Sequence, residues 1–167
     1  VIRSMMFSDV EKYTPNANTW AYMNEDIGRR YNHTATLTSD GDIRIHGGRA
    51  CDPAGINLNC TSQLPVGETS IIPLLSAWTQ FPAASNMVNG KRGNHTATLL
   101  PDGQILLAGG SNGPSLLNTA EVFNTETMLF SNTGRMRQAR DLHTATLLPN
   151  GRVLVAGGFS TTATSTG

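Results

Sequence analysis

Polar and apolar positions alternate in three short segments of identical sequence, His-Thr-Ala-Thr-Leu, at residues 33–37, 95–99 and 143–147. In an extended chain the two threonines face one side, and the His, Ala and Leu side chains face the other. β-Branched residues such as Thr also suit a pleated strand. The pattern therefore predicts a β-strand at each of the three segments.

A turn and a second strand follow each segment. Asp-Gly or Asn-Gly stands at residues 40–41, 102–103 and 150–151, and this is the strongest short hairpin signal, for which we expect positive φ at both residues of the pair. The next strands, at 104–108 and 152–156, are apolar on both faces, as expected between neighbouring sheets. Each unit then ends on two glycines that let the backbone turn and another segment approach closely: Gly47, Gly48, Gly109, Gly110, Gly157 and Gly158.

A second half-unit also recurs. Residues 10–20 match residues 120–130 in length, with their aromatic residues in register, and they predict a third and a fourth strand. The middle copy is degenerate, because Trp78 has no clear Tyr or Phe partner upstream. Four antiparallel strands in a unit of about 50 residues are typical of a β-propeller blade.

These features together resemble the kelch repeat, in its bacterial or secreted form related in blade pattern to galactose oxidase-like propellers. The resemblance rests on the Asp/Asn-Gly hairpin, the double glycine, the Tyr/Phe strand, the late Trp and an Arg-x-x-His-Thr motif. The motif occurs three times, with its arginine and histidine at Arg30 and His33, Arg92 and His95, and Arg140 and His143. The resemblance implies an all-β propeller of four-stranded antiparallel blades.

The chain covers about three blade equivalents of such a propeller, whereas closed rings have four to eight blades. Residues 1–27 are expected to be the second half of a blade, 28–90 and 91–138 one blade each, and 139–167 the first half of another. The ring is then closed by the remaining blades of a longer chain, or by a second copy whose half-blades complete those of the first.

The first full unit carries an insertion, since 62 positions separate His33 from His95 but only 48 separate His95 from His143. It contains Cys51 and Cys60, which we expect to form a disulfide that pins an exposed loop. Asn59-Cys60-Thr61 is also a sequence for N-glycosylation. Both features favour an extracellular or cell-surface location.

The same unit differs chemically from the others. Arg44 and His46 stand where the other units have Leu and Ala, and burying them without partners would cost several kcal/mol. We expect the insertion to supply these partners, in a polar network that supports the loop; the alternative is a ligand pocket. The ligand-binding candidates are Arg44, His46, Arg49, Asp52, Asn57 and Asn59.

The repeated arginines and histidines have a simpler interpretation than a binding site. A histidine that recurs in every unit is expected to hold strands or loops together. Each repeated arginine is expected to contact a carbonyl or an acid, with Glu11 and Glu121, at equivalent positions, as candidate partners.

Copper radical oxidases of the galactose oxidase and glyoxal oxidase group carry blades of similar pattern, so membership of such an enzyme is the alternative function. Their copper site needs two tyrosines and two histidines, with one tyrosine linked to a cysteine, and an adjacent Tyr-His pair. Here Asn32 separates Tyr31 from His33. We therefore expect a binding scaffold rather than an enzyme, with no cofactor and no metal site in this chain.

Composition narrows the choice of partner. Twelve basic residues balance twelve acidic ones, so no net field favours nucleic acid, and no apolar run is long enough to span a membrane. A protein or carbohydrate ligand is expected on the loops that follow the double glycines, at 49–74, 111–118 and 159–167.

Overall fold

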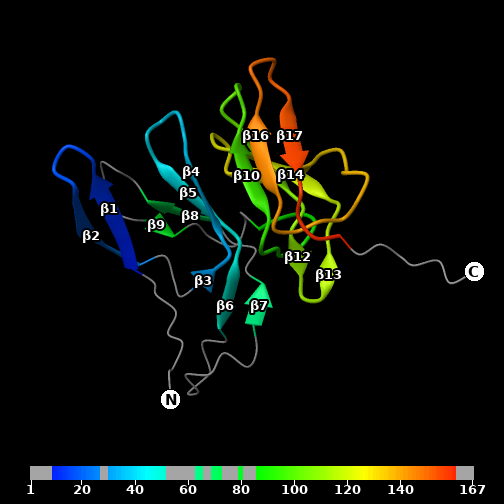
Figure 1. The fold of residues 1–167 in the computed structure, drawn as a ribbon, viewed down its shortest axis with the longest axis horizontal. Helices are drawn as coiled ribbons and strands as arrows, with labels where there is room; N and C mark the ends of the chain where they lie inside the picture. Colours follow the sequence, from blue (N-terminus) through cyan, green and yellow to red (C-terminus); the bar gives the residue numbers. More distant parts are fainter. Residues whose placement is uncertain are drawn as a thin grey trace, which may run out of the picture.

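The computed structural model describes residues 9–26, 30–51, 63–65, 69–72, 79–80 and 86–160. These residues form β-strands and turns, with no helix among them. The strands pair antiparallel in several small sheets that fan out side by side (Figure 1). The predicted all-β class is confirmed.

Two of the sheets are complete, with four strands each in chain order. The first blade consists of β4 (Thr34–Leu37), β5 (Ile43–His46), β8 (Thr69–Ile72) and β9 (Thr79–Gln80). The second blade consists of β10 (Thr96–Leu99), β11 (Ile105–Ala108), β14 (Ala120–Asn124) and β15 (Leu129–Asn132).

Each end of the described chain contributes a two-stranded sheet. The N-terminal half-blade pairs β1 (Asp9–Thr14) with β2 (Thr19–Asp26). The C-terminal half-blade pairs β16 (Thr144–Leu147) with β17 (Val153–Ala156). All four sheets lie within the units 1–27, 28–90, 91–138 and 139–167, whose boundaries stay predictions. The first strands β4, β10 and β16 are neighbours in space.

Small hairpins extend the blades at the end opposite the turns between first and second strands (Figure 1). In the first blade β3 (Arg30–Tyr31), β6 (Arg49–Cys51) and β7 (Gln63–Pro65) form a three-stranded sheet. In the second blade β12 (Ser111–Asn112) pairs with β13 (Ser115–Leu116), and Gly93 bridges to Ser111. The insertion therefore lengthens a hairpin that both blades possess.

The turn between first and second strands differs from the one predicted. In the first blade the Thr38 N–H donates to the Asp42 carbonyl over 2.9 Å and the Gly41 N–H donates to the Thr38 carbonyl over 3.0 Å. Of these residues only Gly41 has a positive φ, of 90°. Asp40 instead accepts the Asp42 N–H with its side chain over 3.2 Å.

The same bonds recur at residues 100–104 and 148–152. The expectation of positive φ at both residues of the Asp-Gly or Asn-Gly pair is therefore wrong. The Asp or Asn is suited to the turn through its side-chain acceptor, and the glycine alone adopts the left-handed conformation.

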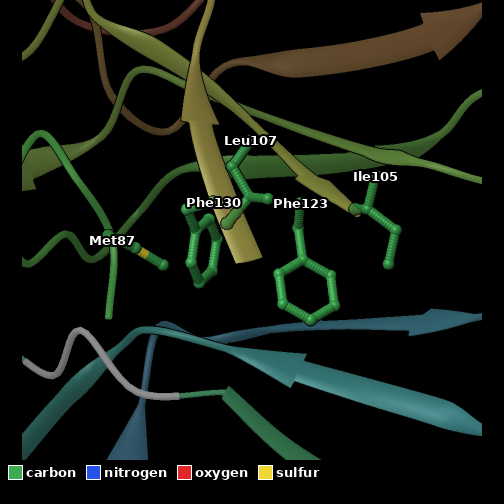
Figure 2. Packing of buried hydrophobic residues seen from close by; sticks show 5 residues of the cluster. All are labelled: Met87, Ile105, Leu107, Phe123 and Phe130. Atoms are coloured by element: carbon green, nitrogen blue, oxygen red, sulfur yellow. The ribbon is translucent and has the colours of Figure 1, made fainter. Parts of the chain in front are cut away.

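The main apolar cluster lies between the two blades. Its buried members come from the second blade and the segment before it: Met87, Ile105, Leu107, Phe123 and Phe130. Figure 2 shows Ile105, Phe123 and Phe130 pointing toward the strands of the first blade, with Met87 extending toward the Phe130 ring. On the other side of the first blade, Ile45 packs against Val10 and Met23 of the N-terminal half-blade. Each sheet is thus packed against its neighbours, as the apolar second strands predict.

The double glycines make the close packing of sheets possible. A Cβ on Gly109, whose φ is 63°, would lie 2.6 Å from the carbonyl oxygen of Arg140 in the next sheet. The Gly110 N–H donates to that same carbonyl over 2.9 Å, and a Cβ on Gly110 would lie 2.5 Å from the carbonyl oxygen of Gly93 in its own blade. Only glycine fits where backbones meet at such distances.

Candidate functional site

The repeated arginines join the two ends of their own repeat. Each donates from Nη1 to the carbonyl of the first glycine of the pair, 17 positions later. The distance is 3.4 Å from Arg30 to Gly47 and 2.9 Å from Arg92 to Gly109. The arginine side chain thus binds the carbonyl of a glycine that has a left-handed φ. This charged hydrogen bond holds the glycine turn in place in every repeat.

Arg92 also forms a buried ion pair with Glu121 on β14, and both side chains are fully buried. The second carboxylate oxygen of Glu121 accepts the Val88 N–H over 2.5 Å. Burial lowers the pKa of Arg92, although the neighbouring Glu121 opposes this shift. The predicted pairing of a repeat arginine with Glu121 is confirmed, and its function is to hold β14 and the segment around Val88 against the core.

The repeated histidines connect one sheet to the next. The Thr34 hydroxyl and His95 Nε2 are hydrogen-bonded at 3.0 Å, and Thr96 and His143 Nε2 are bonded at the same distance. Burial is the main cause that lowers the pKa of His33, His95 and His143, so the neutral ring is favoured. These contacts are structural, in line with the expectation for a histidine present in every unit.

Arg44 is fully buried in β5, and its partners lie in the hairpin turn next to it. Its Nη2 is 2.8 Å from the Asp40 carboxylate and its Nη1 is 3.5 Å from that of Asp42. The Thr38 hydroxyl is the largest of the causes that lower the pKa of Asp40. The expectation that the insertion supplies these partners is thus wrong for Arg44, because the acidic turn is closer along the strand.

His46 lies in the interface between the two blades. It is 0 % exposed, and its ring meets Phe123 edge-on with centroids 5.0 Å apart and Phe130 with centroids 6.0 Å apart. Complete burial, with a smaller contribution from Arg44, lowers the pKa of His46 to about 3. His46 therefore occupies an aromatic packing position in this interface.

A polar network spans one end of the blades. We call this end the hairpin face and define it as strands β6, β7, β12 and β13 together with Gly113, Asn94 and Asp141. Arg49 Nη2 donates to the Ser111 hydroxyl over 2.9 Å and to the Gly113 carbonyl over 3.2 Å. The Asn94 amide donates to the same hydroxyl over 3.4 Å and to the Asp141 carboxylate over 3.3 Å. The network links the first blade to the second and the second to the C-terminal half-blade.

Other candidates from the sequence are only partly placed. Cys51 ends β6, at the base of the insertion. Asp52, Asn57, Asn59 and Cys60 lie outside the described residues, so the disulfide and the glycan stay predictions. Of the three ligand-binding candidates that the structure describes, only Arg49 lies on the hairpin face.

Sequence reasoning missed Asn94, Ser111 and Asp141. For Asn94, the signal in the sequence was its position directly before a repeat histidine. The residue at that position has a left-handed φ in all three copies, of 57°, 57° and 52°. Asn tolerates this conformation best among residues with a side chain, and it stands at two of these positions, Asn32 and Asn94. The Asn94 N–H donates to the Asn32 carbonyl over 3.1 Å, so this position also links neighbouring blades.

Among the residues that the structure describes, no group of three or more His, Cys, Asp or Glu side chains could hold a metal ion. No helix in the same ranges is long and apolar enough to cross a membrane. The chemistry available on the hairpin face is hydrogen bonding from amide, hydroxyl, guanidinium and carboxylate groups.

Residues 91–137 match a family model described as the kelch motif. The matched range contains all four strands of the second blade, together with Arg92, His95 and the Gly109–Gly110 pair. No curated protein matches the chain.

Proposed function

Since the chain belongs to the kelch-repeat family, whose repeats generally mediate protein interactions, we propose that it is a scaffold that binds a protein partner through the hairpin face. The loops of a rigid β scaffold are the usual place for binding residues. The proposed contact residues are Arg49 and the β6–β7 insertion, together with the β12–β13 hairpin.

The observation that supports this proposal is the bond from Arg49 to Ser111 and Gly113. It joins β6 of the first blade to the β12–β13 hairpin of the second, so that the described strands of the two blades are held together on this face. A preorganised surface loses little conformational entropy when a partner binds. The insertion, the part of the repeat that varies most between the two blades, connects β6 to β7 in the sequence.

The balance of charge supports a partner that is recognised by polar and apolar contacts rather than by a strong field. Nucleic acid is therefore not the proposed partner, and carbohydrate binding is an outcome of the test. We further propose an extracellular or cell-surface setting, supported by Cys51, Cys60 and the Asn59 glycosylation sequence. Non-reducing peptide mapping of the protein isolated from its native source tests it: a Cys51–Cys60 peptide and a glycan on Asn59 are the expected result.

The test of the binding face exchanges one hairpin for another. In the test variant, residues 52–62 are replaced by the Gly113-Pro114 turn of the second blade. A matched control replaces Ser39 with Ala in the turn at the opposite end of the first blade. The protein serves as the bait for selection of partners from a displayed library of extracellular domains. In a separate screen it is applied to a glycan array.

The hairpin exchange should abolish binding of the selected partner, and the control should leave it unchanged. Hydrogen exchange should show protection at β6–β7 and β12–β13 on binding. A partner that binds the exchanged hairpin as tightly as the original chain would refute the proposed face, and selection of glycans alone would refute the protein partner.

A further inference from the structure

The sequence contains three Asn-Gly pairs, at residues 89–90, 112–113 and 150–151. An asparagine before glycine can lose its side-chain amide without an enzyme, because glycine has no side chain to shield its backbone nitrogen. That nitrogen attacks the asparagine Cγ. The reaction therefore needs a glycine N–H that is free to lose its proton and a carboxamide that is free to turn toward it.

The pair at 150–151 is held in the turn between β16 and β17. The Gly151 N–H donates to the Leu148 carbonyl over 2.9 Å, so it closes the turn as its fourth residue. The Oδ1 atom of Asn150 accepts the Arg152 N–H over 3.1 Å, which fixes the carboxamide. Attack of the Gly151 nitrogen on Cγ would require both bonds to break.

The pair at 89–90 is held in the same way, in the segment before β10. The Gly90 N–H donates to the Met87 carbonyl over 3.4 Å, again as the fourth residue of a turn. The Nδ2 atom of Asn89 donates to Oδ1 of Asn132 over 2.6 Å. Both the backbone nitrogen and the carboxamide of this pair are thus engaged.

The pair at 112–113 differs from the other two in both respects. Asn112 ends β12 opposite Ser115, and Gly113 is the second residue of the turn, a position whose N–H does not close it. Among the residues that the structure describes, none accepts the Gly113 N–H and none is hydrogen-bonded to the Asn112 side chain. The Asn112 side chain is also exposed. Neither group has to break a bond before the reaction.

From this contrast we propose that Asn112 is a site of self-modification, at which a neutral residue of the hairpin face becomes a carboxylate. The Gly113 nitrogen forms a bond to Cγ of Asn112, the Cγ–Nδ2 bond breaks, and Nδ2 leaves as ammonia with the proton of the Gly113 amide. Water then opens the resulting succinimide ring. The reaction consumes water and releases ammonia, and no atom is oxidised or reduced.

The ring can open at either of its carbonyls, which gives two products. Opening at Cγ leaves an aspartate in a normal backbone. Opening at the main-chain carbonyl of residue 112 leaves an isoaspartate, in which the backbone passes through Cβ and Cγ and is longer by one bond. Both products carry a negative charge, but only the second changes the path of the chain.

The modified residue lies within the hairpin that Arg49 binds. Arg49 Nη2 donates to the Ser111 hydroxyl over 2.9 Å and to the Gly113 carbonyl over 3.2 Å, on either side of Asn112. The longer backbone of the isoaspartate shifts Gly113 relative to Ser111, so that one nitrogen no longer reaches both acceptors. The isoaspartate product therefore weakens the link between the two blades on the hairpin face. This inference does not depend on the proposed protein partner.

The test follows each Asn-Gly pair by peptide mapping after the chain is incubated at neutral pH in water enriched in heavy oxygen. Cleavage after lysine and arginine places the three pairs in different peptides, 50–91, 93–135 and 141–152. Heavy oxygen marks the molecules that reacted during the incubation, and electron-transfer fragmentation distinguishes aspartate from isoaspartate. The same chain in concentrated urea is the matched control, because unfolding removes the structural differences between the pairs.

In the folded chain Asn112 should react at least about tenfold faster than Asn89 and Asn150, since those residues must first give up hydrogen bonds. In urea the three pairs should react at similar rates. No reaction at Asn112, equal rates of the three pairs in the folded chain, or the same preference for Asn112 in urea would each overturn the proposal.

An Asn112→Asp variant carries the charge of the product in a normal backbone, and it isolates the effect of the longer chain. The isoaspartate fraction of the incubated protein should exchange backbone hydrogens in β12–β13 faster than this variant does. Equal exchange in the two proteins would overturn the proposed loss of the Arg49 link.

Discussion

The burial of His46 predicts that the protein loses stability in mild acid. The folded state holds this ring between the two blades with a pKa of about 3, whereas an unfolded histidine titrates near its ordinary value of about 6.5. Below that value the unfolded chain takes up a proton that the folded chain does not bind. The free energy of unfolding therefore falls as the pH falls between the two pKa values.

The size of the effect follows from linkage. Between about pH 7.5 and about pH 5 the unfolded state gains roughly 2 kcal/mol from protonation of this one residue, while folded His46 stays neutral. The range stops at about pH 5 because Asp40 contributes at lower pH: the bond from Thr38 and the ion pair with Arg44 lower the pKa of Asp40, and the folded state loses this stabilisation when the carboxylate is protonated. Burial lowers the pKa of His95 as well, in the same direction.

Urea unfolding of the original chain and of a His46→Phe variant at both pH values isolates the contribution of His46. Phenylalanine keeps a ring against Phe123 and Phe130 but carries no titrating group. The difference in unfolding free energy between the two pH values should be about 2 kcal/mol smaller in the variant, and the contribution of His95 is common to both proteins. Equal differences would refute the assignment of this pH dependence to His46.

Three further outcomes test the contacts between and within the blades. Gly109→Ala should lower the unfolding free energy more than Gly157→Ala in urea titrations, because both glycines have positive φ but only Gly109 meets a neighbouring carbonyl; equal losses would contradict the close contact. Glu121→Gln should cost about 3 to 5 kcal/mol by leaving Arg92 buried without its partner charge, measured by thermal unfolding with calorimetry. Thr96→Val should cost about 1 kcal/mol through loss of its bond to the imidazole of the next sheet, and it should raise hydrogen exchange in β16; an unchanged exchange rate would contradict that link.

Much of the fold could be predicted because the features that define the repeat act over a short range of the sequence. Alternation in the His-Thr-Ala-Thr-Leu segments, the turn glycines and the double glycines act within a few residues, and they correctly indicated four-stranded antiparallel units. The error in the turn shows the limit of such reasoning. An Asp before glycine is compatible with several turn types, and the five-residue loop with a side-chain acceptor was the one formed.

The candidate site was less predictable. Arg44 and His46 stood out as polar residues in an apolar strand, but their sequence context did not indicate whether they face a ligand, the insertion or another blade. The hairpin-face network was missed for a similar reason, since Asn94, Ser111 and Asp141 are polar residues in ordinary loop sequences until the blades bring them together.

The sequence by itself determined the strands, their order in each sheet and the positions where only glycine fits, because hydrogen-bonding partners within a hairpin are close along the chain. Only the tertiary structure decided that Thr34 bonds to His95, 61 positions away, and that His46 packs against Phe123. Contacts between sheets depend on how whole blades are stacked. Stacking is governed by burial and shape rather than by local conformational preference.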